Sequence, residues 1–274
     1  MTQILHLVRL FWRLGFALAV FSLCGCPMAD QKSDHPETAK TSAKQTAKES
    51  SESTAPSALP PYDHEIPVNL GQPLVDKPEN LKRLELASPV WIDNKDKQVV
   101  LIGSVCRAGY PLEFFATYPD RAYESVVVIY TKPSIVHAAL LALGAKPGKP
   151  VEYKPKFVPP SGAEVEIEVA WKDRDGKRQK ARAQDWIRDI KTKKPLEVNW
   201  VFAGSIFWED KSTGEKSYMA DRGDFISVLN LPTALLDLPI ESASALESRL
   251  FEGFVERLPP PGTPVTLILK PKLD

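Results

Sequence analysis

Hydrophobic positions in this chain fall mostly in short runs of strand length, and the clearest run is 163–171, AEVEIEVAW. Its valines and isoleucine alternate strictly with glutamates, which predicts a strand with one buried and one solvated face. Residues 173–176, DRDG, predict a hairpin turn. Residues 177–184 then predict the returning strand, with basic side chains able to face the glutamates across the ladder.

Other runs predict further strands. Residues 123–130, YESVVVIY, are β-branched and mostly apolar, so we expect a buried central strand. Residues 97–105, KQVVLIGSV, predict another strand of similar length. Shorter strands are expected at 90–92, 199–207, 216–219, 224–229, 250–255 and 264–269, with a helical turn at 232–236.

One segment has a helical pattern. Residues 135–143, IVHAALLAL, follow Ser134, which can cap a helix, and precede Gly144, which can end one. The segment is apolar on nearly all sides, which indicates burial. We therefore predict an α+β fold: a β-rich, mostly antiparallel sheet domain with one clear buried helix.

The first residues resemble a bacterial lipoprotein signal. Arg9 and Arg13 precede the uncharged run 14–23, and Leu-Cys-Gly-Cys ends at Cys26. A membrane-spanning helix needs about 20 apolar residues, so this short run fits a cleaved signal better. The alternative is an uncleaved anchor that extends back through 4–11, but the two arginines interrupt it. We expect cleavage before Cys26 and lipidation of its thiol by fatty acids such as palmitate.

The segment after the signal predicts a tether. Residues 27–60 contain no aromatic residue and only Met28 and Leu59 as large aliphatic ones. Such a composition cannot bury enough apolar area to offset chain entropy, so disorder is expected. The predicted organisation is a signal peptide at 1–25, a disordered membrane tether at 26–61 and a globular domain at 62–274. The expected location is the cell envelope, lipid-anchored and extracytoplasmic.

Charge and cysteine content exclude several classes of protein. The chain has 35 basic and 35 acidic residues, and loss of 1–25 removes two arginines and no acid, which leaves a net charge of −2. A near-neutral chain has no general attraction to nucleic-acid phosphates. Cleavage and lipidation leave only Cys106, so neither an internal disulfide nor a zinc ribbon or iron–sulfur cluster held by one chain is expected.

Several longer motifs resemble one bacterial family. Glu124–Val127, His137–Ala145, Ala183–Trp186 and Trp200–Ser205 are similar to motifs of the YdjY domain, as are Ala220-Asp221, Gly223–Phe225, Leu236–Pro239 and Gly262–Val265. The resemblance covers roughly 90–270 and implies little about function. Two positions depart from the family pattern: Tyr123 stands where relatives have His, and Ser227 where they have Cys. A site that needed either side chain would differ here.

His137, Glu124 and Cys106 form the first candidate site. An imidazole titrates near neutral pH and can act as a ligand or a base, and a thiol beside Arg107 can become reactive. These three would suit a metal- or redox-linked enzyme if they converge. The alternatives are a buried His137 bonded to a carbonyl or to Glu124, and a Cys106 that only fills apolar space.

Asp185, Asp221 and Asp224 lie beside aromatic or glycine-rich turns and form a second set, together with Trp186. Paired carboxylates can bind cations or serve as acid and base, so a hydrolase that uses Asp185 or Asp221 is a weaker possibility. Turn capping and surface ion pairs are the simpler interpretation.

Aromatic residues crowd the same part of the chain, and they predict either a ligand groove or a packed core. They are Trp186, Trp200, Phe202, Phe207 and Trp208.

No phosphate-binding loop, dinucleotide fingerprint, nucleophile elbow or zinc-protease motif occurs. Enzymatic activity thus has no positive support, and cofactors and metals stay unassigned. We expect a membrane-anchored binding or interaction module for an envelope protein or a small ligand, not for nucleic acid. The alternative is the metal- or redox-linked enzyme centred on His137, Glu124 and Cys106.

Overall fold

The computed structural model describes residues 70–273 except 87, 107–110, 210, 212, 215 and 243–250. All described residues belong to one unit, Ala58–Asp274. The predicted signal peptide and tether, including Cys26, lie outside the described residues and stay predictions.

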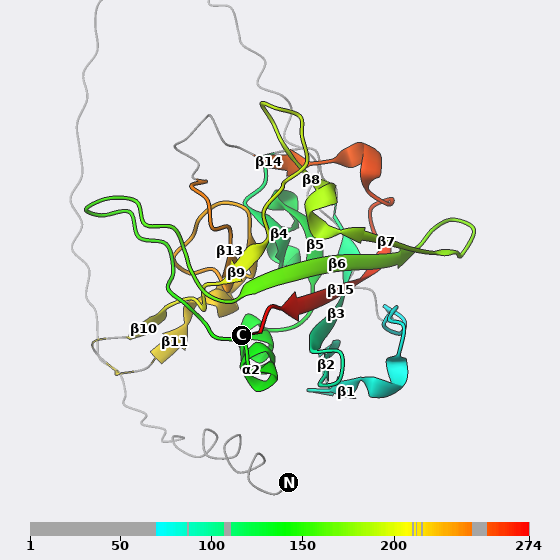
Figure 1. Cartoon of the computed structure of the whole chain (residues 1–274), viewed down its shortest axis with the longest axis horizontal. Coiled ribbons are helices and arrows are strands. Elements are labelled where there is room, and N and C mark those ends of the chain that lie inside the picture. Colours follow the sequence, from blue (N-terminus) through cyan, green and yellow to red (C-terminus); the bar gives the residue numbers. More distant parts are fainter. Residues whose placement is uncertain are drawn as a thin grey trace, which may run out of the picture. The chain divides into compact units, whose positions relative to one another are not determined.

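Eight strands of the main sheet close into a barrel (Figure 1). Each strand pairs with the next around the ring, and the last pairs with the first. In ring order they are β3 (Gln98–Val105), β15 (Pro264–Pro271), β6 (Glu164–Lys172), β9 (Trp200–Phe202), β13 (Leu236–Asp237), β12 (Ile226–Ser227), β4 (Phe114–Thr117) and β5 (Ser125–Ile129).

Shorter elements extend this barrel. Two strands continue outward from β3, one pairs with β6, and two small two-stranded sheets stand apart from the main sheet. These are β2 (Val90–Asp93) and β1 (Lys82–Arg83); β7 (Arg178–Arg182); β10 (Phe207–Glu209) with β11 (Lys216–Tyr218); and β8 (Ile187–Asp189) with β14 (Phe251–Gly253). The helices are α2 (Pro133–Leu143) and the 3-10 turns η1 (Pro78–Asn80), η2 (Pro119–Glu124), η3 (Ala183–Trp186), η4 (Met219–Arg222) and η5 (Val255–Arg257).

The β-rich fold with one α-helix agrees with the prediction, but the sheet is mixed and not mostly antiparallel. β4 pairs parallel with β5, and β12 pairs parallel with β13. In each case the connection, 118–124 or 228–235, carries the chain back to the end where the first strand began. A hairpin turn would have reversed the chain and made the pair antiparallel.

β6 confirms the alternating pattern. Val165, Ile167 and Val169 are buried, whereas Glu164 and Glu166 are exposed. The returning strand, β7, follows a turn in which the Gly176 amide donates to the Asp173 carbonyl at 3.0 Å. Its Lys180 pairs with Glu168 at 2.9 Å, as expected for basic side chains that face the glutamates.

α2 is present, but only one face of it is buried. Val136, Ala139 and Leu140 join the barrel core, while the Leu141 side chain is 46% exposed, so the prediction of burial on nearly all sides is wrong. Gly144 ends the helix with φ 98°, as expected. Ser134 does not cap it, because the helix begins at Pro133 and no side chain of its own caps the first turn. The described residues include no helix with the length and hydropathy that a bilayer crossing requires.

Three local predictions need correction. The run 199–207 is not one strand, because Gly204 and Ser205 take left-handed φ values of 86° and 61° and separate β9 from β10. In 224–229 only Ile226–Ser227 pairs as a strand. The segment 232–236 forms a turn and not a helix, since its last residue enters β13.

Candidate functional site

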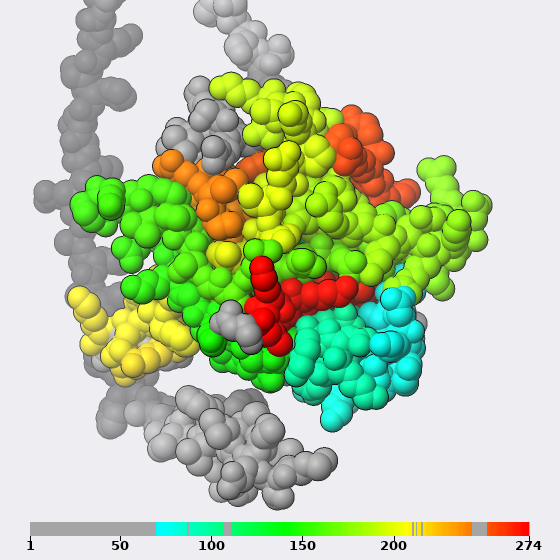
Figure 2. All heavy atoms as spheres, in the orientation of Figure 1, coloured from blue at the N-terminus to red at the C-terminus, as the bar shows by residue number. Residues whose placement is uncertain are grey.

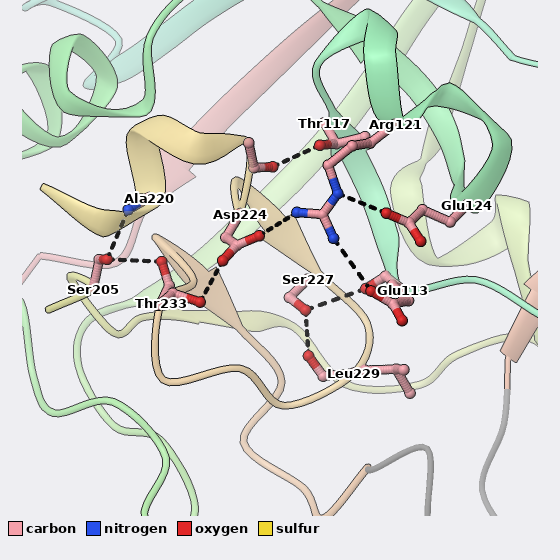
Figure 3. Close-up of polar contacts among 11 residues, drawn as sticks. Glu113, Thr117, Arg121, Glu124, Ser205, Ala220, Asp224, Ser227, Leu229 and Thr233 are labelled. Carbon is pink, nitrogen blue, oxygen red and sulfur yellow. Dashed lines mark hydrogen bonds and ion pairs between the residues drawn. The ribbon is translucent and has the colours of Figure 1, made fainter. Parts of the chain in front are cut away.

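Arg121, on η2, lies at the centre of a charged cluster (Figure 3). Its Nε donates to Glu124 Oε1 at 2.6 Å, and its Nη1 donates to Asp224 Oδ1 at 2.5 Å. Nη2 reaches Glu113 Oε2 at 3.3 Å. The guanidinium carbon also lies 4.3 Å from the centre of the Phe114 ring. One cation thus binds three carboxylates that come from three separate segments.

Backbone groups around this arginine cluster also form hydrogen bonds between segments. The Glu113 carbonyl accepts the Val228 and Leu229 amides. It also accepts the Ser227 hydroxyl (Figure 3). Asp224 also accepts the Thr233 hydroxyl. These bonds join the start of β4 to the segment around β12, so the cluster closes one part of the barrel.

The cluster contains one positive charge and three carboxylates, so acidic groups are in excess. Burial raises the pKa of the Glu113 carboxyl, the Glu124 and Asp224 charges raise it further, and Arg121 acts in the opposite direction. Burial by itself would lower the pKa of Arg121, but its hydrogen bonds to Glu124 and Asp224 outweigh that effect and raise it. The cluster therefore depends on its single guanidinium.

Asp221 caps α2 from outside the helix. Its Oδ1 accepts the Ser134 amide and its Oδ2 accepts the Ser134 hydroxyl, each at 2.8 Å. A carboxylate at a helix N-terminus satisfies unpaired amides and is stabilised by the helix dipole. The capping interpretation of this aspartate therefore agrees with its geometry.

His137 lies on α2 beside this cap and contacts β11. Its Nδ1 is 2.7 Å from the Tyr218 hydroxyl, and that hydroxyl donates to the Gly204 carbonyl at 3.0 Å. With this arrangement, Nδ1–H donates to the tyrosine oxygen. The imidazole also packs edge-on against Phe202, with ring centres 4.8 Å apart. Burial lowers the pKa of His137, which favours the neutral ring.

The metal or redox candidates thus have separate surroundings. Glu124 is bonded to Arg121, His137 is bonded to Tyr218, and Cys106 lies at 1% exposure among Ala122, Val128 and Tyr130. Within the described part of the chain, no group of three or more His, Cys, Asp or Glu side chains is arranged to hold a metal ion. The structure does bring two of the sequence candidates together, Glu124 and Asp224, through Arg121.

Asp185 and Trp186, on η3, have different environments although they are adjacent. Asp185 forms a surface ion pair with Arg182 at 2.8 Å. Trp186 is 1% exposed and packs edge-on against Trp171, with ring centres 5.1 Å apart. Asp185 therefore fits the interpretation as a surface ion pair, and Trp186 fits the interpretation as a core residue.

The aromatic residues divide between core and surface. Trp200 and Phe202 are fully buried, and the Trp200 indole donates to the Ser227 carbonyl at 2.7 Å. Phe207 and Trp208 are instead 68% and 48% exposed, and the neighbouring Ile206 is 40% exposed. Three consecutive large apolar side chains therefore face solvent at the start of β10, in the hairpin that β10 forms with β11.

This hairpin stands apart from the barrel. β10 pairs only with β11 among the described strands, with Phe207 opposite Tyr218 and Trp208 opposite Ser217. The rings of Phe207 and Tyr218 lie 5.2 Å apart, and Tyr218 in turn reaches His137. Tyr218 holds the base of the hairpin together with the Met219 amide, which donates to the Ile206 carbonyl at 3.0 Å. Much of the remaining apolar surface of the hairpin faces solvent. Figure 1 shows β10 and β11 at the left edge of the domain.

A scan against family models matches residues 90–270 to the YdjY domain. The chain belongs to the YdjY-domain family. The match spans the barrel, α2, the arginine cluster and the β10–β11 hairpin, and it confirms the resemblance seen in the sequence. No curated protein and no solved structure matches the chain.

The two positions expected to depart from the YdjY pattern, Tyr123 and Ser227, lie next to residues of the arginine cluster. Tyr123 is 64% exposed next to Glu124. Ser227 is fully buried, and its hydroxyl bonds the backbone carbonyls of Glu113 and Leu229. In this chain Ser227 therefore serves the structure of the barrel.

Asp237, in the family motif Leu236–Pro239, is a buried acid that sequence reasoning did not single out. It accepts the Leu238 amide at 2.7 Å and the Asn230 side-chain amide at 3.1 Å. Burial raises the pKa of this carboxyl to about 7, although its N–H partners act in the opposite direction. A single Asp between two leucines carries no sequence signal for this, because its burial depends on the closed barrel.

Proposed function

We propose that this YdjY-domain protein is a lipid-tethered binding module of the cell envelope, and that the β10–β11 hairpin is its binding element. One observation carries the proposal: Ile206, Phe207 and Trp208 are exposed together on a hairpin separate from the main sheet. Grouped apolar side chains on a surface mark interaction sites more often than isolated ones do. The tether itself rests on the sequence pattern around Cys26.

The hairpin geometry suits an extended polypeptide. Neighbouring residues of a strand point to opposite faces, so Phe207 and Trp208 present apolar surface on both faces of the hairpin. Each strand of a two-stranded sheet also has one unpaired edge that can accept another strand. An apolar segment of an envelope protein could therefore pair along an edge and cover both aromatic rings.

The arginine cluster supports a binding role over a catalytic one. Its carboxylates already bind a guanidinium, and His137 already bonds a tyrosine. These polar groups already bind other parts of the chain, whereas much of the Phe207 and Trp208 surface is exposed, although Phe207 packs against Tyr218.

In-cell cross-linking of the full chain followed by isolation tests the binding element. We expect Phe207→Ser/Trp208→Ser to reduce recovery of the cross-linked partner by about 30-fold or more, because aromatic anchors dominate interface energies. The matched control is Leu84→Ser/Leu86→Ser, since both leucines are also exposed. Equal recovery from all three proteins would refute the hairpin as the binding element.

The tether has a separate test. Cells are labelled with a fatty-acid analogue, and label is compared in wild type, Cys26→Ala and Cys24→Ala. We expect Cys26→Ala to lose the label and Cys24→Ala to keep it. Equal labelling of all three would contradict lipidation at Cys26.

A further inference from the structure

We propose that residues 146–158 form a basic loop that binds the anionic lipid headgroups of the membrane carrying the tether. This inference rests on the proposed lipid tether and adds to it an orientation of the domain. The loop sequence, KPGKPVEYKPKFV, contains four lysines and a single acid, Glu152, in a chain whose overall net charge is zero. Its positive charge is therefore local and not a property of the whole protein.

Three of the four lysines of this basic loop are available for a partner. Lys149, Lys154 and Lys156 are exposed, and no acidic side chain in the described residues pairs with them. By contrast, Lys180 and Lys270 both bind Glu168, and Lys193 binds Glu252. Unpaired cations that lie close together in the sequence of one loop suit a surface of many anionic groups.

The loop also carries apolar groups that suit the boundary between water and lipid. Tyr153 and Val158 are 42% and 41% exposed, and the rings of Tyr153 and Phe157 lie 6.0 Å apart. Aromatic side chains favour this boundary, and lysines can extend from it toward headgroups. An acidic polypeptide would satisfy the charges but gives no reason for these exposed apolar groups.

Backbone hydrogen bonds give the loop a fixed shape. Glu152 and Val158 exchange two of them, at 3.1 and 2.8 Å, and the Tyr153 hydroxyl donates to the Asn230 carbonyl at 2.7 Å. At its base, Gly162 has φ 135°, and a side chain there would lie 2.1 Å from the Phe202 carbonyl oxygen. The lysines are thus presented on a defined support, which lowers the entropy lost on binding. Figure 2 shows the loop as a green projection above the yellow hairpin.

The expected affinity of the basic loop for anionic lipid is sufficient for attachment only together with the tether. Attraction to an anionic surface favours binding by about fivefold per lysine, hence by about 100-fold for three lysines. That is marginal for a free protein, and stable attachment needs a second signal such as an acyl chain. A coil as long as the predicted tether, residues 26–61, has an r.m.s. span of about 33 Å, so a tethered domain would meet the surface at high effective concentration.

Lysine footprinting by mass spectrometry tests the inference. The mature protein, as cells produce it, is mixed with vesicles of phosphatidylcholine or of phosphatidylcholine with phosphatidylglycerol, and flotation reports attachment separately. We expect Lys149, Lys154 and Lys156 to react about tenfold more slowly on the anionic vesicles, while Lys95, Lys191 and Lys194 do not change. Lys154→Glu/Lys156→Glu should abolish protection of Lys149, and the control Lys191→Glu/Lys194→Glu should leave it intact.

Each other outcome overturns the inference in a distinguishable way. Protein that floats with both kinds of vesicle but shows equal loop reactivity retains the tether and loses the lipid-binding loop. Protein that floats with neither kind and shows no protection loses both proposals. Protection by soluble polyglutamate but not by anionic vesicles would assign the loop to an acidic polypeptide instead.

Discussion

The arginine cluster and the β10–β11 hairpin differ in how far their side chains find partners within the chain. Around Arg121, three carboxylates share one guanidinium, one of them from Asp224 far along the chain, and the Glu113 carbonyl accepts further bonds. On the hairpin, Phe207 and Trp208 are 68% and 48% exposed. Charged groups at one place have all their partners, while apolar groups at the other place lack cover.

This contrast shows where function can be sought in a fold without a catalytic motif. Acidic residues in conspicuous motifs attract attention as candidate catalysts, but here Glu124, Asp221 and Asp224 bind other parts of the same chain. Exposed aromatic groups cost solubility and contribute little to folding. Their presence is better explained by a partner.

The largest expected effect tests the structural role of the arginine cluster. Arg121→Met leaves Glu113, Glu124 and Asp224 without their shared cation, so we expect the free energy of unfolding to fall by about 2–4 kcal/mol. The loss should shrink as pH falls, beginning with Glu113, whose pKa is raised. Denaturant unfolding at several pH values measures it.

Arg182→Met is the matched control for the arginine cluster. Arg182 also pairs with an acid, Asp185, but its side chain is 62% exposed. A surface pair of this kind contributes about 1 kcal/mol or less. Equal small losses in both variants would remove the distinction between the cluster and an ordinary surface pair.

Asp237 gives the next effect, which depends on pH. The folded pKa, about 7, lies above the ordinary value of 3.8, so the folded chain binds the proton more tightly. Proton binding by Asp237 therefore stabilises the folded state at low pH. This stabilisation is lost as pH rises from about 4 to 7, by up to about 1.4 kcal/mol of unfolding free energy per pH unit. Asp237→Asn should remove that slope. Unfolding curves that stay parallel for both proteins across this range would show that burial does not raise the pKa.

Tyr218→Phe is expected to have a smaller effect at the base of the hairpin. It removes the hydroxyl that His137 and Gly204 share, which should cost about 1 kcal/mol of unfolding free energy. Tyr123→Phe, at a 64% exposed position, is the control and should have no measurable effect. Thermal unfolding of both variants compares them, and an unchanged Tyr218→Phe would mean that this bond does not hold the hairpin.

The smallest effect on stability is expected on the hairpin itself. Phe207→Ser/Trp208→Ser should change the free energy of unfolding by about 0.5 kcal/mol or less per site, since Phe207 is 68% and Trp208 48% exposed on a surface hairpin. The same variant should lose its partner. A large loss of stability would show that the aromatic side chains are part of the core, and the contrast with the arginine cluster would then fail.

Local patterns in the sequence predicted much of the fold. β6 was visible because buried and exposed residues alternate along it, and α2 because an apolar run ends at Gly144. Closure of the barrel was not predictable, because it depends on pairing between β3 and β5 and on short strands such as β4 and β13. Strands of two to four residues carry too little pattern to be recognised.

The candidate site was predictable only in part. The sequence indicated Asp224 and Glu124 as separate acids, but not Arg121, which joins them from a position 103 residues before Asp224. It grouped five aromatic residues, and only the structure separated the buried Trp200 from the exposed Trp208. Contacts between distant segments decide both results, and no local spacing records them.

The most direct test of the account is photo-cross-linking in living cells with a photoreactive residue at position 208 or at position 123. Both positions are exposed, but Trp208 is on the hairpin and Tyr123 is beside the arginine cluster. We expect a discrete adduct from position 208 and none from position 123. An adduct from position 123 alone would place the binding surface at the arginine cluster and contradict the account.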